Sequence, residues 1–286
     1  MKLKDKNLYY VGGIVRDEIL GIKNFDTDYC YEGNAIEFAQ NLGLNIIKEN
    51  PKFGTVRVLL NNEEIDIAST RTEVYPKVGH LPKVKNIGCS LYEDLKRRDF
   101  TINAMAKRTT DGEIVDIFGG INDIKNKTLR VLHEKSFIDD PTRILRSLKF
   151  SIRFGFEQDK ITHKLQNDYL SNINYDMSYH RIKKELKETF NLNKQICYDK
   201  FVEEKSYKLL TPNAVAPSFR PTFNNINFDE PWIIYLSFFD LSNLELTRRE
   251  KRILEWAERL KTEQSSNNTP KESLLINQIY QEAIHG

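Results

Sequence analysis

The sequence is poor in cysteine and lacks long apolar runs. Its three cysteines, Cys30, Cys89 and Cys197, lie far apart among 286 residues, so they form neither the disulfide framework of a small secreted domain nor the closely spaced ligands of a zinc site. No uncharged apolar run approaches the roughly 18 residues that span a bilayer, and the first residues lack the apolar stretch of a signal peptide. We therefore expect a soluble protein of the reducing cytoplasm that has no membrane partner.

An excess of charge of one sign is also missing. The 43 Lys and Arg residues are matched by 41 Asp and Glu residues, a formal net charge of only +2, whereas a typical nucleic-acid-binding protein is strongly basic. Any binding of a polyanion must therefore depend on a local patch. Residues 131–210, with 15 basic and 12 acidic side chains, are the most basic part of the chain.

The length is sufficient for about two domains, and the hydrophobic pattern changes along it. Up to about residue 130, short β-rich runs alternate with helical patterns, whereas residues after Asp139 show long amphipathic helices and no convincing strand. We predict an α+β protein with a head of mixed sheet and helices (1–130), a helical neck (131–210) and a short helical body and tail (211–286). Strands are expected at 8–11, 25–31, 55–60, 64–68 and 113–117, helices at 15–20, 35–42, 100–106, 141–154, 178–190 and 248–261, and a long loop at 211–231.

Three aspartates have the pattern of a metal site. Asp26 and Asp28 alternate on a predicted strand, so both project from one face, roughly 6.5 to 7 Å apart along the chain. In the run EIDIA the isoleucines take one strand face and Asp66 the other, so Asp66 could approach the pair from a neighbouring strand. An isolated pair of this kind is more often a solvated strand end, and Asp66 alone could simply face solvent. The surrounding motifs favour the metal site.

A Gly-Gly turn precedes these aspartates. The run YYVGGIVRD is an apolar strand that breaks at Gly12 and Gly13 directly into a helix, and such a turn exposes backbone N–H groups where phosphate binds well. Arg16, one turn into the helix, could add a charge-assisted contact. The motif is neither a P-loop nor a GxGxxG fingerprint, so it gives no support for a kinase or a dehydrogenase.

Two further helical patterns carry charged residues on one face. In EDLKRRDFTINAMA, Asp99 and Asn103 are four residues apart with Arg98 beside them, so a sugar or phosphate could be bound there. A second helix opens at Asp139-Asp140-Pro141 and is well formed at its start. Helix formation explains Asp139 and Pro141 but does not require Asp140, Arg143 and Arg146 on one stripe.

Taken together, these motifs resemble the class II CCA-adding tRNA nucleotidyltransferase and bacterial poly(A) polymerase family, within the DNA polymerase β nucleotidyltransferase superfamily. The matching segments span residues 9–186, about two thirds of the chain, and their joint order and spacing are highly specific. In order they are VGGIVRD, DTD, FGTVRV, EIDIASTRTE, EDLKRRDFTINAMA, VDIFGGINDIKNKTLRV, DDPTRILRSLKFSIRFGF and the weaker SYHRIKKEL.

The resemblance implies a nucleotidyltransferase head followed by helical neck, body and tail, and it assigns roles to residues. Asp26 and Asp28 would bind two catalytic Mg²⁺ ions, with Asp66 as the third catalytic carboxylate, either a metal ligand or a proton acceptor. The resemblance also implies two sets of nucleotide-binding residues. Gly13 and Arg16 would contact the triphosphate, Arg98 and Asn103 the nucleotide, and Asp140, Arg143 and Arg146 the base, with Lys149 where the family commonly has a third arginine.

The activity that the resemblance implies is addition of C, C and A to the tRNA 3′ end from CTP and ATP, without a nucleic-acid template. Rivals on the same scaffold are an A-adding enzyme, a CC-adding enzyme and a poly(A) polymerase. An enzyme that modifies a protein or small molecule is disfavoured by the template helix, and an inactive RNA-binding module by the presence of all three acids. Nothing in the sequence indicates an obligate protein partner.

The segment at 72–90 bears on how many nucleotides are added. It is as long as the flexible loop of full CCA-adding members, but its central run EVYPKVGHLPKV lacks the acid and arginine pair that many of them have. We rank length above this pair and predict complete addition of C, C and A.

Overall fold

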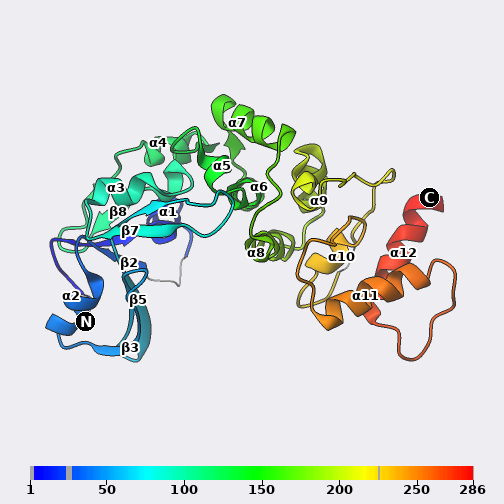
Figure 1. Ribbon diagram of the computed structural model, residues 1–286, viewed down its shortest axis with the longest axis horizontal. Coiled ribbons are helices and arrows are strands. Elements are labelled where there is room, and N and C mark those ends of the chain that lie inside the picture. The colour runs from blue at the N-terminus through cyan, green and yellow to red at the C-terminus, as the bar shows by residue number, and fades with distance from the viewer. Residues whose placement is uncertain (1–2, 24–27, 225, 286) are drawn as a thin grey trace. The chain divides into compact units, whose positions relative to one another are not determined.

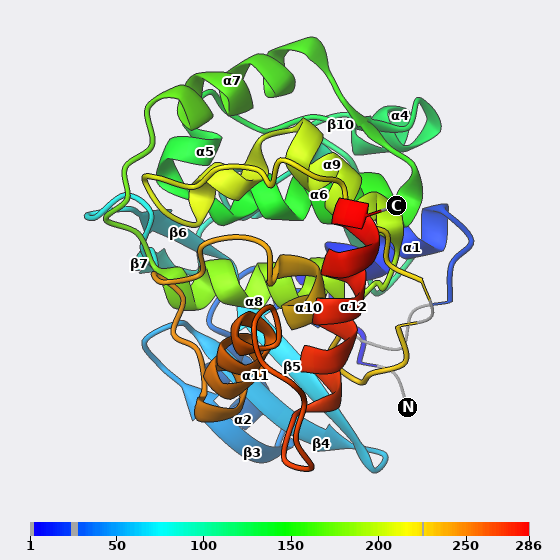
Figure 2. The ribbon, with the colours of Figure 1, turned by 90° about the vertical axis from the view of Figure 1, so that its right-hand side faces the viewer.

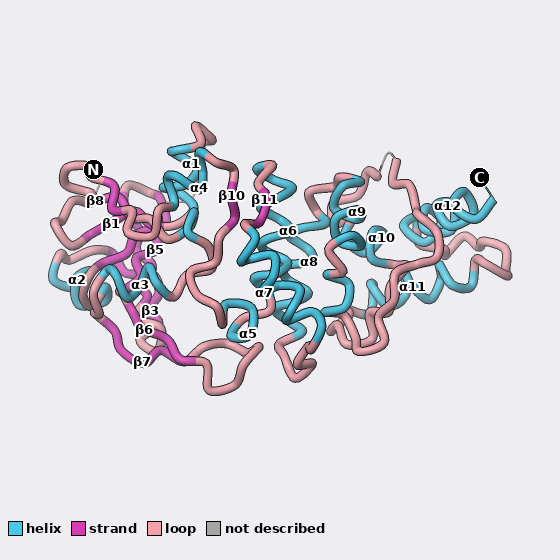
Figure 3. Tube along the Cα trace, turned by 90° about the horizontal axis from the view of Figure 1, so that it is seen from above, coloured by secondary structure: helices cyan, strands magenta, loops and turns pink. Residues whose placement is uncertain are grey.

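The computed structural model describes residues 3–23, 28–224 and 226–285, which form two compact units (Figure 1). The first unit comprises residues 1–139 and 156–163, and the second comprises residues 140–155 and 164–286. All strands of the described residues belong to the first unit, and the second is helical (Figure 3). The predicted α+β class is thus confirmed.

A seven-stranded mixed sheet forms the centre of the first unit. β2 and β5 pair in parallel, and the other neighbours pair antiparallel. The parallel pair lies inside the sheet, where it joins the N-terminal strands to a three-stranded meander. In sheet order the strands are β3 (Asn45–Asn50), β4 (Thr55–Leu60), β5 (Glu63–Ser69), β2 (Asp28–Tyr31), β1 (Leu8–Val11), β8 (Ala106–Arg108) and β9 (Ile114–Val115).

The alternation of apolar residues along these strands builds a core on each face of the sheet. On one face, Val56 and Val58 of β4 and Ile67 of β5 are buried beneath α2 (Ala35–Asn41), whose first turn is capped by Asn34. On the other face a second cluster is formed by Tyr9, Val11, Cys30, Ala104 and Ala106, with Leu91 and Leu95 from α3 (Leu91–Lys96).

Several elements differ from the sequence prediction. Residues 100–106 do not form a helix, because Thr101–Asn103 is a short 3-10 turn (η1) followed by β8. β3 was not predicted, since its apolar residues are few and most of its side chains are exposed. A strand also follows Asp139, because β11 (Glu157–Gln158) pairs with β10 (Thr128–Leu129). The remaining helices of this unit are α1 (Gly13–Ile19), α4 (Gly120–Lys125) and α5 (Ser136–Asp139).

The second unit is a set of helices around an aromatic core. α6 (Thr142–Phe154) packs on α8 (Tyr179–Phe190) and α9 (Gln195–Glu203), and α11 (Arg248–Arg259) lies beside α12 (Lys271–His285) (Figure 2). α7 (Lys160–Ser171) connects the two units, and η2 (Ser206–Leu209) and α10 (Trp232–Leu236) complete the set. The core rings include Phe190, Phe201, Phe223, Tyr235 and Phe239. None of the described helices is both long and apolar enough to cross a membrane.

Candidate active site

Two of the three predicted carboxylates lie side by side at one edge of the sheet. Because β1 and β2 are antiparallel, the end of β1 at Val11 and the start of β2 at Asp28 share this edge. In the parallel pair of β2 and β5, Asp28 is the register partner of Asp66. Register partners on adjacent strands project from the same face, about 4.8 Å apart. Asp26 lies outside the described residues.

Asp66 is also held by its other neighbouring strand. Its register partner on β4 is Arg57, whose Nε and Nη2 donate to the two carboxylate oxygens at 2.8 Å each. A bidentate pair of this kind fixes the plane of the carboxylate. Both side chains are about half exposed, so the pair orients Asp66 more than it stabilises the fold.

The donor set at this edge fits a hard divalent cation. Mg²⁺ binds carboxylate oxygens and keeps several waters, and Asp28 and Asp66 present such oxygens on an exposed part of the sheet. Within the ranges that the structure describes, no group of three or more His, Cys, Asp or Glu side chains is arranged to hold a metal ion. A complete site would therefore need a ligand such as Asp26.

The Gly-Gly turn opens α1 beside these carboxylates. Gly12 has φ 68° and ψ −121°, a conformation that only glycine adopts easily. A Cβ atom at this position would lie 2.9 Å from Nη1 of Arg98. The backbone thus passes directly beneath a guanidinium group, which brings the predicted residues Gly13 and Arg98 into one region.

Arg16 is not the exposed phosphate ligand that its position predicted. It is only 5% exposed, because its guanidinium donates to Asp17 at 2.7–2.8 Å and to Oδ1 of Asn103 at 2.5 Å. Asn103 in turn donates to both carboxylate oxygens of Asp99 at 3.0 and 3.2 Å. Asp99 and Asn103 therefore meet as predicted, but through the η1 turn and not through a helix face.

Asp94 forms the centre of a second buried network that sequence reasoning missed. Its fully buried carboxylate accepts hydrogen bonds from the side chains of Arg97 and Arg98 and from the backbone N–H of Arg71. Burial raises the pKa of Asp94, but the charges and hydrogen bonds of Arg98 and Arg97 outweigh it and hold this pKa below its ordinary value. Asp94 thus fixes Arg98 above the Gly-Gly turn.

The segment predicted as a flexible loop at 72–90 is mostly a β-hairpin. β6 (Arg71–Val74) pairs with β7 (Lys83–Ile87), and the base is tied by Glu73, which accepts from Arg71 at 2.8 Å and Arg97 at 3.1 Å. An acid and arginine group is therefore present at the base, although the central run lacks one. At the tip, the N–H of Gly79 donates to the carbonyl oxygen of Asp139 at 3.1 Å.

In the second unit, the carboxylate of Asp140 is held at the start of α6. Oδ1 accepts from the backbone N–H of Thr142 at 3.2 Å and from its hydroxyl at 2.6 Å. Oδ2 accepts from Nη2 of Arg181 on α8, which forms an ion pair with it. Asp140, and not Asp139, is thus the acid that caps this helix, since Asp139 ends α5.

The basic residues of α6 are drawn toward α8. Arg146 pairs with Glu185 at 3.3 Å, and Lys149 pairs with Glu185 at 2.8 Å and Glu188 at 2.5 Å. Arg143 is 4% exposed and lies one turn from Asp140. Lys149, only 8% exposed, is occupied by two carboxylates, so its position serves the packing of α6 on α8.

Comparison with known proteins connects these features to one family. A model of the poly(A) polymerase head domain matches residues 8–130. A solved structure of a CCA-adding enzyme in an apo form superposes with a TM-score of 0.75 and 30% identity, over 96% of this chain and 75% of that one. The chain belongs to the class II CCA-adding tRNA nucleotidyltransferase and poly(A) polymerase family.

Curated relatives within this family differ in the name of their activity. The chain is 47% identical over 164 residues to an A-adding tRNA nucleotidyltransferase of Aquifex aeolicus, covering 55% of this chain and 20% of that protein. It is 37% identical over 180 residues to a CCA-adding enzyme of Leuconostoc mesenteroides, covering 60% of this chain and 43% of that protein. The chain thus spans less than half the length of either relative.

Several residues of the class II family site were not singled out from the sequence. Each lies in a quoted motif: Asp17 in VGGIVRD, Asp94 in EDLKRRD, and Arg181 with Glu185 in SYHRIKKEL. The spacing of Arg181 and Glu185, four residues apart on α8, places them on one helix face toward α6. That spacing was the available signal, but it needed the pairing of α8 with α6 to become interpretable.

Proposed function

We propose that this chain is a tRNA 3′-terminal nucleotidyltransferase that uses CTP and ATP. The observation that carries this proposal is the register of Asp28 with Asp66 at the sheet edge where the Gly-Gly turn opens α1. In a family of this fold, two carboxylates beside a turn that exposes backbone N–H groups are suited to bind a nucleotide triphosphate and its cations. The cytoplasmic location expected from the sequence stays a prediction.

The residues of the head would position the reacting groups. Backbone N–H groups of the Gly-Gly turn and the guanidinium of Arg98 lie where the triphosphate would need donors. Arg16 would act through Asn103, which it holds by a hydrogen bond. Divalent cations held by Asp26 and Asp28, with Asp66 beside them, would activate the RNA 3′-hydroxyl and neutralise the pyrophosphate leaving group. The displacement joins the 3′-oxygen to the α-phosphorus and releases pyrophosphate.

Asp140 and Arg143 would select the base. Cytosine and adenine each present an amino donor beside a ring-nitrogen acceptor, so a carboxylate and a guanidinium can bind either one. Guanine and uracil reverse this pattern and would leave a charged group unpaired, at a cost of a few kcal/mol. The hydrogen bonds that hold Asp140 on both oxygens support this role, because they fix the direction of its free lone pairs.

Two specificities are compatible with this site. Complete addition of C, C and A is supported by the hairpin, which retains full length and an ordered base. Addition of A alone is supported by the higher identity to a relative with that name, 47% against 37%. Complete addition is our first candidate and A-addition our second.

One experiment separates these outcomes. We would incubate tRNA ending at the discriminator base, or at CC, with CTP or ATP alone or together, and resolve the products to single nucleotides. We expect C and C from CTP, and a final A only when ATP is added. Extension only of tRNA that ends in CC would replace the first candidate by the second, and products that stop at CC with ATP present would indicate a CC-adding enzyme.

Variants of the carboxylates provide the link to the site. Asp28→Asn and Asp66→Asn should each reduce incorporation by more than 100-fold. Glu63→Gln removes an exposed carboxylate from the same strand as Asp66 and should have little effect. If wild-type protein binds tRNA but incorporates no nucleotide, the chain is an RNA-binding module and the proposed function is wrong.

A further inference from the structure

The positive charge of the C-terminal region is concentrated on one helix. Residues 211–286 contain 8 basic and 10 acidic side chains, and six of the eight basic ones lie within residues 248–261. Four cations lie on one exposed face of α11, interrupted by a single acid, because their spacing of three and four residues aligns them. We call this the α11 basic face: Arg248, Lys251, Arg252, Glu255 and Arg259.

This arrangement is unfavourable for the helix itself. Three of the four cations lie in its first two turns, where the helix dipole is positive, and neighbours at three and four residues repel one another. The N-terminus does not need them, since Thr247 and Glu250 form a capping box. Arg252 is tied to the carbonyl of Asn268. Arg248 and Lys251 have no acidic side chain as partner among the described residues.

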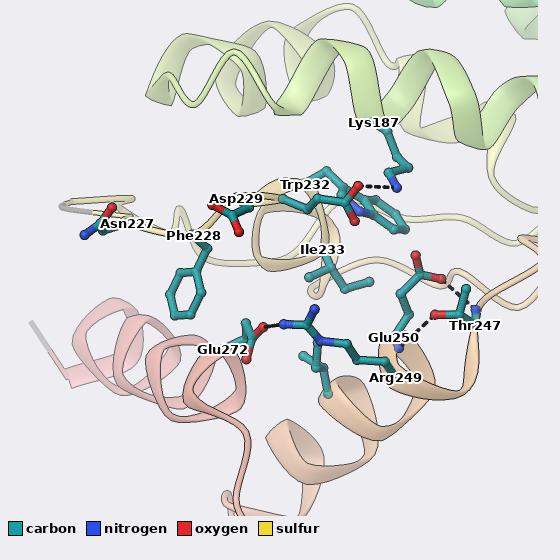
Figure 4. Close-up of a pocket in the computed structure, with 12 residues that line it drawn as sticks. Lys187, Asn227, Phe228, Asp229, Trp232, Ile233, Thr247, Arg249, Glu250 and Glu272 are labelled. Atoms are coloured by element: carbon teal, nitrogen blue, oxygen red, sulfur yellow. Dashed lines mark hydrogen bonds and ion pairs between the residues drawn. The ribbon is translucent and has the colours of Figure 1, made fainter.

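The neighbouring cavity does not explain these charges. A cavity of about 540 Å³ lies between α8, α11, α12 and the segment before α10 (Figure 4). Its two cations are already neutralised, because Lys187 pairs with Glu230 and Arg249 with Glu272. With Asp229 and Glu250, carboxylates outnumber cations in its lining. An anionic ligand would therefore be attracted to the outer face of α11 and not into the cavity.

We propose that the α11 basic face binds the phosphate backbone of the RNA substrate, an inference that rests on the proposed function. Arginine provides three of its four cations, and a guanidinium matches phosphate oxygens bidentately. None of the described residues of α11 is an exposed large apolar side chain, which a membrane-binding helix or the core of a protein interface requires. Phosphates spaced along a nucleic acid match a row of cations without apolar neighbours.

The place of α11 in its unit indicates which part of the RNA is bound. α6, which carries Asp140 and Arg143, and α11 lie at opposite ends of the second unit (Figures 1 and 3). The α11 basic face would therefore contact the RNA away from its 3′ end. It would contribute to affinity for the whole substrate and leave the chemical step and the choice of nucleotide unchanged.

The test uses the double variant Arg248→Gln/Lys251→Gln in the full chain, since neither side chain has a structural partner there. Binding of unmodified tRNA without nucleotide would be measured by fluorescence anisotropy between 50 and 300 mM KCl. We expect Kd to rise roughly fivefold or more at 150 mM salt, and the slope of log Kd against log salt to fall by about one for each lost phosphate contact. The Tm should stay equal or rise, because repulsion at the helix start is relieved.

A matched control removes two cations from another helix. Lys160→Gln/Lys164→Gln neutralises two exposed residues of α7 with the same net change and should leave Kd within twofold. Equal weakening by both variants, or unchanged binding by the α11 variant, would overturn the proposal. So would binding to phosphatidylserine vesicles that depends on Arg248 and Lys251 while tRNA binding does not, since the partner would then be a membrane.

Kinetics distinguish this inference from the proposed function. The α11 variant should raise KM for tRNA while kcat and the ratio of incorporated nucleotides stay at wild-type values. If the wild-type protein incorporates no nucleotide, the proposed function fails, but the anisotropy measurement still decides whether α11 binds RNA. If incorporation occurs and the α11 variant lowers kcat with KM unchanged, the surface assignment is wrong.

Discussion

Asp140 is already bound at both oxygens before any nucleotide arrives. Thr142 occupies one oxygen and Arg181 the other, so the carboxylate retains only the lone pairs that point away from α6 and α8. An unconstrained carboxylate could rotate to accept from a donor at either edge of a base. We infer that Arg181 positions Asp140 and thereby contributes to base selection without touching the base.

This role predicts a specific effect of Arg181→Gln. Loss of one charge-assisted hydrogen bond, about 1.5–3 kcal/mol, should lower the preference for CTP and ATP over UTP and GTP by roughly 10- to 100-fold, measured as ratios of kcat/KM. Arg181→Lys keeps the charge and should retain part of the preference. Asp140→Ala gives the limit of the effect, and Lys184→Gln, an exposed position on the same helix, is the control. An unchanged ratio in Arg181→Gln would contradict the positioning role.

Single residues could be predicted from the sequence as far as local spacing determines them. Alternation in EIDIA was enough to put Asp66 on the opposite face from its isoleucine neighbours. Its register partner Asp28, however, depends on the parallel pairing of two strands that are distant in sequence. The burial of Arg16 was missed for the same reason, since its partner Asn103 is 87 residues away.

At the scale of elements, Asp94 joins α3 to the base of the hairpin. It binds Arg97 and Arg98 beyond the end of α3 and the backbone of Arg71 at the start of β6. Removing its charge would leave two guanidinium groups partly buried without an anion, which costs much more than the loss of an exposed pair. The orientation of the hairpin and of Arg98 should therefore depend on this one carboxylate.

Asp94→Asn should lower the free energy of unfolding by roughly 3 kcal/mol at pH 7. Because the pKa of Asp94 is depressed in the folded state, its stabilisation is fully present above the unfolded value of about 4 and is lost as pH falls through the folded pKa. The difference between wild type and variant should thus be constant from pH 5 to 7 and shrink below pH 4. Urea unfolding at several pH values measures it.

An exposed carboxylate serves as the control for that series. Asp111 also has a lowered pKa, through the backbone N–H of Glu113 and the side chain of Arg108, but it is fully exposed. Asp111→Asn should therefore change stability little at any pH. A difference for Asp94→Asn that persists unchanged at pH 3 would mean that its cause is packing and not charge.

Most elements could be predicted, and the exceptions have physical causes. β1 and β4 match the expected ranges, and α6, α8 and α11 match within a few residues, because each carries a strong apolar pattern. The segment 100–106 was assigned to a helix because its apolar residues have helical spacing. Backbone hydrogen bonds of the η1 turn and the pairing of β8 with β1 override that local preference.

At the scale of the whole molecule, a nearly balanced charge hides a strong segregation. The sheet edge with Asp28 and Asp66 belongs to the first unit and is suited to cations, whereas the α11 basic face belongs to the second and is suited to anions. Two sites in separate units that share no residue should act independently, so effects of their variants on free energies should add.

Magnesium tests this independence together with the metal site. A cation that binds only the folded state stabilises it by RT ln(1 + [Mg²⁺]/Kd), about 1.4 kcal/mol at tenfold excess over Kd. Wild-type protein and the Arg248→Gln/Lys251→Gln variant should therefore gain a few degrees of Tm on addition of MgCl₂, whereas Asp28→Asn should not. Removal of Mg²⁺ with EDTA should abolish incorporation and leave the tRNA anisotropy signal of the α11 basic face in place. A wild-type Tm that does not respond to Mg²⁺ at concentrations that support incorporation would place the cations on the nucleotide, with Asp28 and Asp66 contributing only after it binds.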